Sequence, residues 1–177
     1  EIIRSCHKRD IKVITYFNVM AIEIARKYHP EWLLTRENGE KGNIVSLFSG
    51  YFEEMLLPQL EEFNTLYKVD GLFFDFLWVA NPDDVHAKNK FYSETGEEYP
   101  KSEESISWSK YIRWLLAEGR RFRHEAIEAI HRGNPKTIVG VNWSYNFRQP
   151  EVPPENLGFL TLDIMPQDQV YEGSFIA

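Results

Sequence analysis

The sequence has almost no cysteine and none of the common cofactor motifs. Cys6 is the one cysteine in the chain, which excludes an internal disulfide framework and a cysteine-based zinc cluster. There is no Gly-x-Gly-x-x-Gly run and no phosphate-binding loop. The five histidines show no metal-ligand spacing such as His-Glu-x-x-His. We therefore expect a site that uses neither a metal ion nor an organic cofactor.

Positive charge and long apolar runs are also scarce. The formal net charge is −7, which argues against nucleic acid or an anionic membrane as the main partner. No apolar run is long enough to span a bilayer, and no signal peptide is visible. The chain opens on Glu1 rather than methionine and looks like an excerpt. We expect a secreted or periplasmic protein if a signal peptide precedes Glu1, and a cytoplasmic one otherwise.

An aromatic run from Tyr67 to Phe76 is the clearest predicted strand. It is entered by Asp70-Gly71, is flanked by helical patterns and is too short for a helix, which indicates a buried parallel strand. Asp75 lies at its C-terminal end, where α/β folds and barrels place their chemistry. The alternative is that Asp75 caps the loop that follows.

Strands and helices alternate along the rest of the chain. β-Branched and aromatic residues predict three more strands, at 11–17, 137–143 and 157–163. Apolar periodicity predicts helices at 21–28, 48–66 and 107–131. Pro58 should break the second helix, and Gly133 should cap the third.

The connections complete this pattern. Residues 37–42 form a polar turn region, and residues 77–105 are predicted to be a long functional or disordered loop. We see no hairpin signal, so the alternation indicates a parallel sheet.

Polar residues end all four predicted strands, at Asn18, Asp75, Asn142 and Asp163. In a parallel barrel these ends surround one mouth. Two carboxylates facing one pocket are the minimum equipment for glycoside hydrolysis, since one attacks the anomeric carbon and the other protonates the leaving oxygen. The alternative for the two asparagines is hydrogen bonding to loop backbone.

Individual residues can be assigned candidate roles on this basis. Asp75 is the candidate nucleophile, because a strand end holds it rigidly. Candidates for the general acid follow the fourth strand or lie in the long loop, at Asp163, Asp168, Glu172 and Glu94. Candidates for sugar contact are polar or aromatic: Tyr16, Asn18, His29, Trp32, Trp78, His86, Asn142 and Trp143.

Residues 51–75 resemble the α-L-fucosidase-like glycoside hydrolases and a related group of hypothetical glycosyl hydrolases. The resemblance is carried by Tyr51, by Pro58-Gln59-Leu60-Glu61-Glu62, by Tyr67 and by Phe73-Phe74-Asp75. His29-Pro30-Glu31-Trp32 followed by Gly39 is similar to the second group. In the fucosidase family the matching aspartate is the catalytic nucleophile, which implies that role for Asp75.

A second segment shows a weaker likeness. Asp163-Ile164-Met165-Pro166-Gln167 is similar to the family segment Asp-Tyr-x-Thr-Pro-Glu, but Gln167 replaces the glutamate and Asp168 stands beside it.

The resemblance implies a parallel (β/α)8 barrel, of which this chain supplies about half the strands. An ordinary barrel needs ~250 residues, so the remainder is expected outside residues 1–177, which form one partial catalytic domain without a second domain. The implied function is a retaining glycoside hydrolase that cleaves a terminal sugar, with carbohydrate as its partner. The alternatives are a non-catalytic carbohydrate-binding barrel and a β-galactosidase-like barrel hydrolase.

Overall fold

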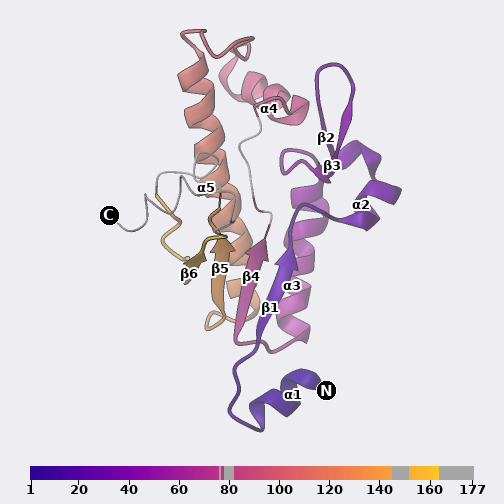
Figure 1. Cartoon of the computed structure of the whole chain (residues 1–177), viewed down its shortest axis with the longest axis vertical. Coiled ribbons are helices and arrows are strands. Elements are labelled where there is room, and N and C mark those ends of the chain that lie inside the picture. The colour runs from indigo at the N-terminus through magenta and orange to yellow at the C-terminus, as the bar shows by residue number, and fades with distance from the viewer. Residues whose placement is uncertain (76, 78–81, 145–151, 164–177) are drawn as a thin grey trace.

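A computed structural model of the protein describes residues 1–75, 77, 82–144 and 152–163. Its main feature is a parallel sheet in the order β1-β4-β5-β6, with all strands pointing the same way (Figure 1). The strands are β1 (Ile14–Asn18), β4 (Gly71–Asp75), β5 (Ile138–Asn142) and β6 (Phe159–Thr161). Each overlaps its predicted range, and the predicted parallel sheet is confirmed. Over the described residues the sheet is open, with β1 and β6 at its edges.

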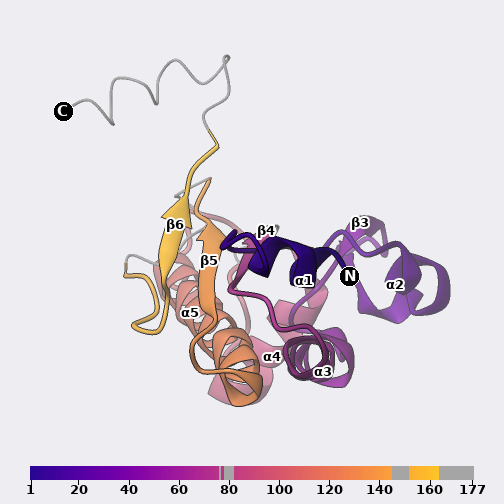
Figure 2. The same cartoon turned by 90° about the horizontal axis from the view of Figure 1, so that it is seen from below.

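Two helices, α3 (Leu57–Leu66) and α5 (Trp108–Gly133), cover one face of this sheet (Figure 2). Successive side chains in a strand point to opposite faces, so Leu72 and Phe74 of β4 are buried against the helices while Asp75 points to the other face. That other face is apolar and open: Ile14 is 56% exposed and Ile138 is 55% exposed.

Shorter helices complete the fold. They are α1 (Ile2–His7), α2 (Glu23–Tyr28), the 3-10 turn η1 (Pro30–Trp32) and the π-helical segment η2 (Phe52–Leu56), which runs directly into α3. The predicted irregularity at Pro58 is therefore present as a wider turn before the proline. Proline lacks an N–H, so it interrupts the regular hydrogen-bond ladder of the helix.

A β-hairpin corrects the expectation that the chain contains none. Strands β2 (Leu33–Thr35) and β3 (Lys41–Val45) pair antiparallel. In the turn between them Gly39 adopts a φ of 81°, and the side chain of Asn38 accepts a hydrogen bond from the backbone N–H of Glu40. The turn signals were visible in the sequence, but a three-residue strand is too short to show an alternating pattern.

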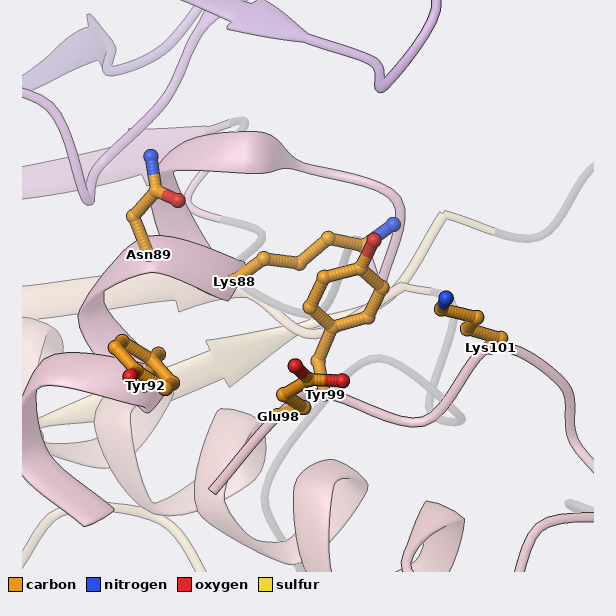
Figure 3. Close-up of a pocket in the computed structure, with 6 residues that line it drawn as sticks. All are labelled: Lys88, Asn89, Tyr92, Glu98, Tyr99 and Lys101. Carbon is orange, nitrogen blue, oxygen red and sulfur yellow. The ribbon is translucent and has the colours of Figure 1, made fainter. Parts of the chain in front are cut away.

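A helix also stands inside the segment expected to be a long loop. Helix α4 (Val85–Thr95) is capped at its start by Asp84, whose side chain accepts from the N–H of His86. Gly96, in the left-handed conformation, caps its end. Phe91 packs on Tyr111 of α5 with the ring centroids 5.1 Å apart. Lys88 of α4 reaches toward Tyr99 in the segment that follows the helix (Figure 3).

Gly133 does not cap α5 as predicted. It is the last residue of the helix, and Asn134 is the capping residue. A Cβ at Gly133 would lie 3.2 Å from the Cβ of Asn64 on α3. The glycine is therefore used for the close approach of α3 and α5, and not for a left-handed turn.

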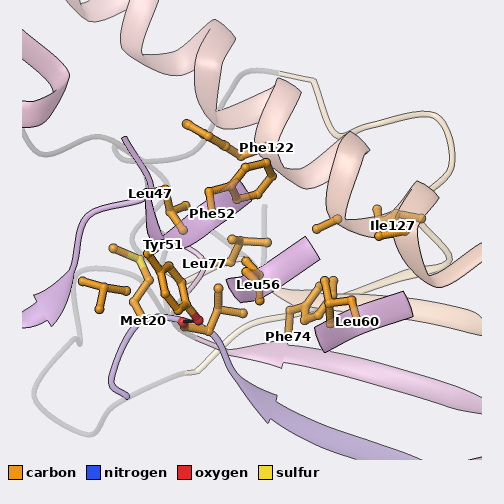
Figure 4. Close-up of a cluster of buried hydrophobic side chains, with 14 of the residues drawn as sticks. Met20, Leu47, Tyr51, Phe52, Leu56, Leu60, Phe74, Leu77, Phe122 and Ile127 are labelled. Carbon is orange, nitrogen blue, oxygen red and sulfur yellow. Dashed lines mark hydrogen bonds between the residues drawn. The ribbon is translucent and has the colours of Figure 1, made fainter. Parts of the chain in front are cut away.

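The main core lies between the sheet and helices α3 and α5 (Figure 4). Phe52, Leu56 and Leu60 face Phe122 and Ile127 of α5, and all five are buried. Phe52 and Phe122 meet edge to face with ring centroids 4.5 Å apart. This packing fixes the helical face of the sheet, and with it the direction in which the side chains at the strand ends point.

Candidate active site

The strand register brings the predicted polar residues to one edge of the sheet. Asn18 is paired with Asp75 across β1 and β4, and Phe74 is paired with Val141, which places Asn142 at the same level. Asp75 and Asn142 both point to the face without helices, because Phe74 and Val141 point into the core. The two side chains therefore meet above the carboxyl ends of their strands.

Asp75 is held by two neighbouring strands at once. The hydroxyl of Tyr16 on β1 donates to its Oδ2 at 2.7 Å, and Nδ2 of Asn142 on β5 donates to its Oδ1 at 3.0 Å. Its backbone carbonyl accepts from the N–H of Val19 at 3.0 Å. A carboxylate fixed at both oxygens has little rotational freedom, which suits a group that must meet a reacting atom.

Asp163 lies beside Asp75, and the two are linked by the side-chain amide of Asn142. Nδ2 of Asn142 also donates to Oδ2 of Asp163 at 2.6 Å. The nearest oxygens of the two aspartates are thus at most about 5.6 Å apart, the sum of the 3.0 Å and 2.6 Å hydrogen bonds. Each hydrogen of the amide can serve one carboxylate. Asn142 is 2% exposed, so the bridge is built on a buried side chain.

Ser144, which the sequence did not suggest, completes this group. Its N–H donates to Oδ1 of Asn142 at 3.0 Å, and its Oγ accepts from the N–H of Asp163 at 2.7 Å. These bonds orient the amide so that its NH2 group faces the carboxylates. The single available signal was the position of Ser144 two residues after a strand-end asparagine.

The charge of the two aspartates affects Tyr16. Its hydrogen bond to Asp75 raises the pKa of Tyr16 to about 12, with further contributions from burial and from the negative charges of Asp75 and Asp163. Tyr16 therefore stays a neutral hydrogen-bond donor at ordinary pH. Proposed from the sequence as a sugar contact, it acts in the structure as a partner of Asp75.

Asn18 and Trp143 have structural contacts away from the two aspartates. Oδ1 of Asn18 accepts from the N–H of Ala21 at 2.9 Å, so this side chain orders the loop after β1, the alternative left open by the sequence. Trp143 packs against the main core, with the guanidinium of Arg123 lying 5.3 Å from its ring centroid. Its ring is therefore on the side of α5, whereas its neighbour Asn142 is on the side of the aspartates.

Three further candidates gather at the β2–β3 hairpin. His29 stacks on Trp32 with centroids 3.8 Å apart, and its Nδ1 lies 2.9 Å from a carboxylate oxygen of Glu31. Trp32 is 7% exposed, so it offers no open ring face to a sugar. Nε2 of His86 lies 3.2 Å from the carbonyl oxygen of Leu33. His86 of α4 therefore contacts the hairpin, whereas His29 and Trp32 pack on each other in the turn before it.

The remaining candidates divide into two groups. Glu94 accepts from Nε1 of Trp114 at 2.9 Å, which places it between α4 and α5. Trp78, Asp168 and Glu172 lie outside the described residues.

The described part of the chain lacks the features of two other classes of site. No group of three or more His, Cys, Asp or Glu side chains there could hold a metal ion. No helix there is long and apolar enough to cross a membrane.

Two solved structures are similar to this chain. The solved alpha-L-fucosidase isoenzyme 2 from Paenibacillus thiaminolyticus is 22% identical, with a TM-score of 0.58 over 79% of this chain. This chain spans 22% of the length of that protein. Ega3 from Aspergillus fumigatus, solved in complex with galactosamine, is 16% identical, with a TM-score of 0.45 over 80% of this chain and 47% of that one.

A family model matches this chain, although no curated protein sequence does so significantly. The family model, described as alpha-L-fucosidase, matches residues 1–149, which include β1, β4 and β5 with Tyr16, Asp75 and Asn142. By that match, the chain belongs to the alpha-L-fucosidase family.

Proposed function

We propose that this chain carries the nucleophile end of a retaining glycoside hydrolase that removes a terminal α-L-fucose or a closely similar sugar. One observation carries the proposal: a buried amide, Asn142, bridges two carboxylates at the carboxyl ends of strands of one parallel sheet. The nearest carboxylate oxygens of Asp75 and Asp163 are at most about 5.6 Å apart, which is compatible with the roughly 5 to 5.5 Å of retaining enzymes. This distance is below the roughly 6.5 Å minimum of inverting ones.

The chemistry assigned to Asp75 is attack on the anomeric carbon. A bond forms between that carbon and a carboxylate oxygen while the glycosidic C–O bond breaks, and a carboxylic acid delivers a proton to the leaving oxygen. Water then hydrolyses the glycosyl-enzyme and restores Asp75. Each carboxylate oxygen has a second lone-pair direction, so the hydrogen bonds from Tyr16 and Asn142 are compatible with attack.

The proton donor is assigned less narrowly. Asp163 is supported by its place beside Asp75, and Asp168 and Glu172 remain candidates from their position after β6 in the sequence. An acid must be protonated while the nucleophile is ionised, and adjacent negative charge favours the protonated form.

We also propose that the sheet is part of a closed (β/α)8 barrel. Helices α3 and α5 cover one face, while the other face exposes Ile14 and Ile138. A doubly wound sheet would have helices on both faces, whereas the inner face of a barrel is filled by side chains of its own strands.

The test is Asp75→Gly in the complete protein. We expect turnover of nitrophenyl α-L-fucoside to fall by ~10³-fold or more, about 4 kcal/mol of barrier, while the protein remains folded. Added azide should restore part of the rate, because the small anion can fill the vacated space and attack the anomeric carbon.

Asp70→Asn is the matched control. Asp70 stands at the opposite end of the same strand, where its carboxylate accepts from the N–H of Val13 at 2.9 Å and lies 2.7 Å from His7. Its loss should lower stability and leave kcat nearly intact. Wild-type rates in Asp75→Gly would refute the nucleophile assignment, and preferential cleavage of a β-galactoside would redirect the substrate class.

A further inference from the structure

Helix α4 and the segment after it form a pocket with a volume of about 570 Å³, within the usual range for small-molecule sites. It is separate from the two aspartates at the strand ends. The residues that line it are Lys88, Asn89 and Tyr92 of α4, followed by Glu98, Tyr99 and Lys101 (Figure 3). From these we infer that the pocket binds a neutral sugar unit. This inference rests on the proposed function, because it takes the ligand to be part of a glycan.

Lys88 is the unusual residue of this pocket. Its side chain is 8% exposed, which is rare for lysine. The ammonium lies 4.2 Å from the ring centroid of Tyr99 and 3.6 Å from a carboxylate oxygen of Glu37. Over the described residues Lys88 makes an ion pair and a cation–π contact but no side-chain hydrogen bond. The nearly buried ammonium group of Lys88 can therefore donate hydrogen bonds to an acceptor atom of a ligand that enters the pocket.

The balance of charge favours a neutral ligand. Lys88 faces Glu37, and the lining also holds Lys101 and Glu98, so neither sign of charge prevails. An anionic ligand would be opposed by the carboxylates, and a cationic one by the two ammonium groups. A polyhydroxylated ligand can use both, because each hydroxyl donates to a carboxylate and accepts from an ammonium or an amide such as that of Asn89.

Tyr92 supplies an apolar surface beside these polar groups. It is 57% exposed, whereas its neighbour Phe91 is buried against α5. The carbon-bound hydrogens on one face of a pyranose ring pack well on an aromatic ring, and exposed aromatic side chains are frequent in carbohydrate sites. The combination of a tyrosine face, an amide, and charges of both signs therefore matches a sugar better than a peptide or a nucleotide.

The position of the pocket fits this ligand. Helix α4 follows β4 in the sequence and lies beyond the carboxyl ends of β1 and β4 (Figure 1). In parallel barrels, segments at this end of the strands surround the active site. A glycan whose terminal sugar reaches Asp75 could therefore place a more distant unit on Tyr92.

The test is a calorimetric binding titration of the complete protein carrying Asp75→Asn, so that no probe is consumed. The probes are lactose and 2′-fucosyllactose as neutral saccharides and 3′-sialyllactose as an acidic one. Adding Tyr92→Ala should weaken binding of both neutral probes at least about fivefold, because one aromatic contact is lost. Tyr28→Ala is the matched control, since Tyr28 is 63% exposed on α2 and does not line the pocket; it should change nothing.

A second variant, Asn89→Ala, keeps the test independent of the tyrosine and should weaken the same probes. Unchanged affinity in both pocket variants, or an effect confined to 3′-sialyllactose, would overturn the inference. Failure of the proposed enzyme activity is read out separately, as absence of nitrophenyl fucoside turnover with Asp75 present.

Discussion

Tyr16 links a titratable hydroxyl to the proposed nucleophile. The Asp75 carboxylate accepts a hydrogen bond from the Tyr16 hydroxyl at 2.7 Å. This bond raises the pKa of Tyr16 to about 12. An unfolded tyrosine ionises near pH ~10. Between about pH 10 and pH 12 the folded state therefore keeps this proton, whereas the unfolded state has lost it. The stabilisation of the folded state is complete below about pH 10 and disappears as the pH rises toward 12.

Comparison with Tyr16→Phe should isolate that effect. We expect the wild type to be the more stable protein by a constant margin at pH 7 to 9, and the margin to shrink through about pH 10 to 12. Urea unfolding of both proteins at each pH measures it. Other tyrosines titrate equally in both proteins and cancel. A margin that is the same at pH 8 and pH 11.5 would show that the hydrogen bond to Asp75 contributes nothing.

The pairing of β5 with β6 depends on one small residue in β5. Gly140 is opposite Phe159, and a Cβ there would lie 2.1 Å from the Cζ atom of the Phe159 ring. The phenyl ring thus lies over the glycine, and it also stacks on Phe73 of β4. Because Asp163 follows β6, the position of this ring affects where the second carboxylate lies.

Gly140→Ala should destabilise the protein by about 1 to 3 kcal/mol, because the ring of Phe159 must leave its place. The double variant Gly140→Ala with Phe159→Leu should recover part of that loss, since the clash is removed. Thermal melts of the two single variants and the double variant measure the coupling. Strictly additive changes would mean that the alanine acts elsewhere.

The elements differ in how well the sequence specifies them. Strand β4 could be predicted, because aromatic residues run unbroken between helical patterns, and α5 could be predicted from its apolar stripe. Helix α4 was missed, because its exposed face is polar and its signals, Asp84 and Gly96, stand outside the helix itself. The role of Asn142 could not be predicted in full, because it depends on a register between strands that are distant in sequence.

At the scale of the whole molecule, the open apolar face of the sheet is the most consequential surface. Tyr16, Ile14 and Ile138 are all more than half exposed on it. If the sheet belongs to a closed barrel, these side chains are covered by the remaining strands.

Residues 1–177 produced alone should therefore bind the dye ANS strongly and tend to associate, whereas the complete protein should do neither. ANS fluorescence and light scattering at matched concentration make the comparison. Ile14→Thr with Ile138→Thr should reduce both signals in the isolated chain. Equal dye binding by the two proteins would contradict the barrel.

The register of β4 also limits how the length of this chain can vary between relatives. Every residue of β4 is paired with β1, and four of them are paired with β5 as well. Inserting or deleting one residue in this strand would turn Asp75 into the core and bring Phe74 to the site. Single-residue insertions and deletions among homologues should therefore be absent from residues 71–75 and concentrate at turns such as that around Gly39.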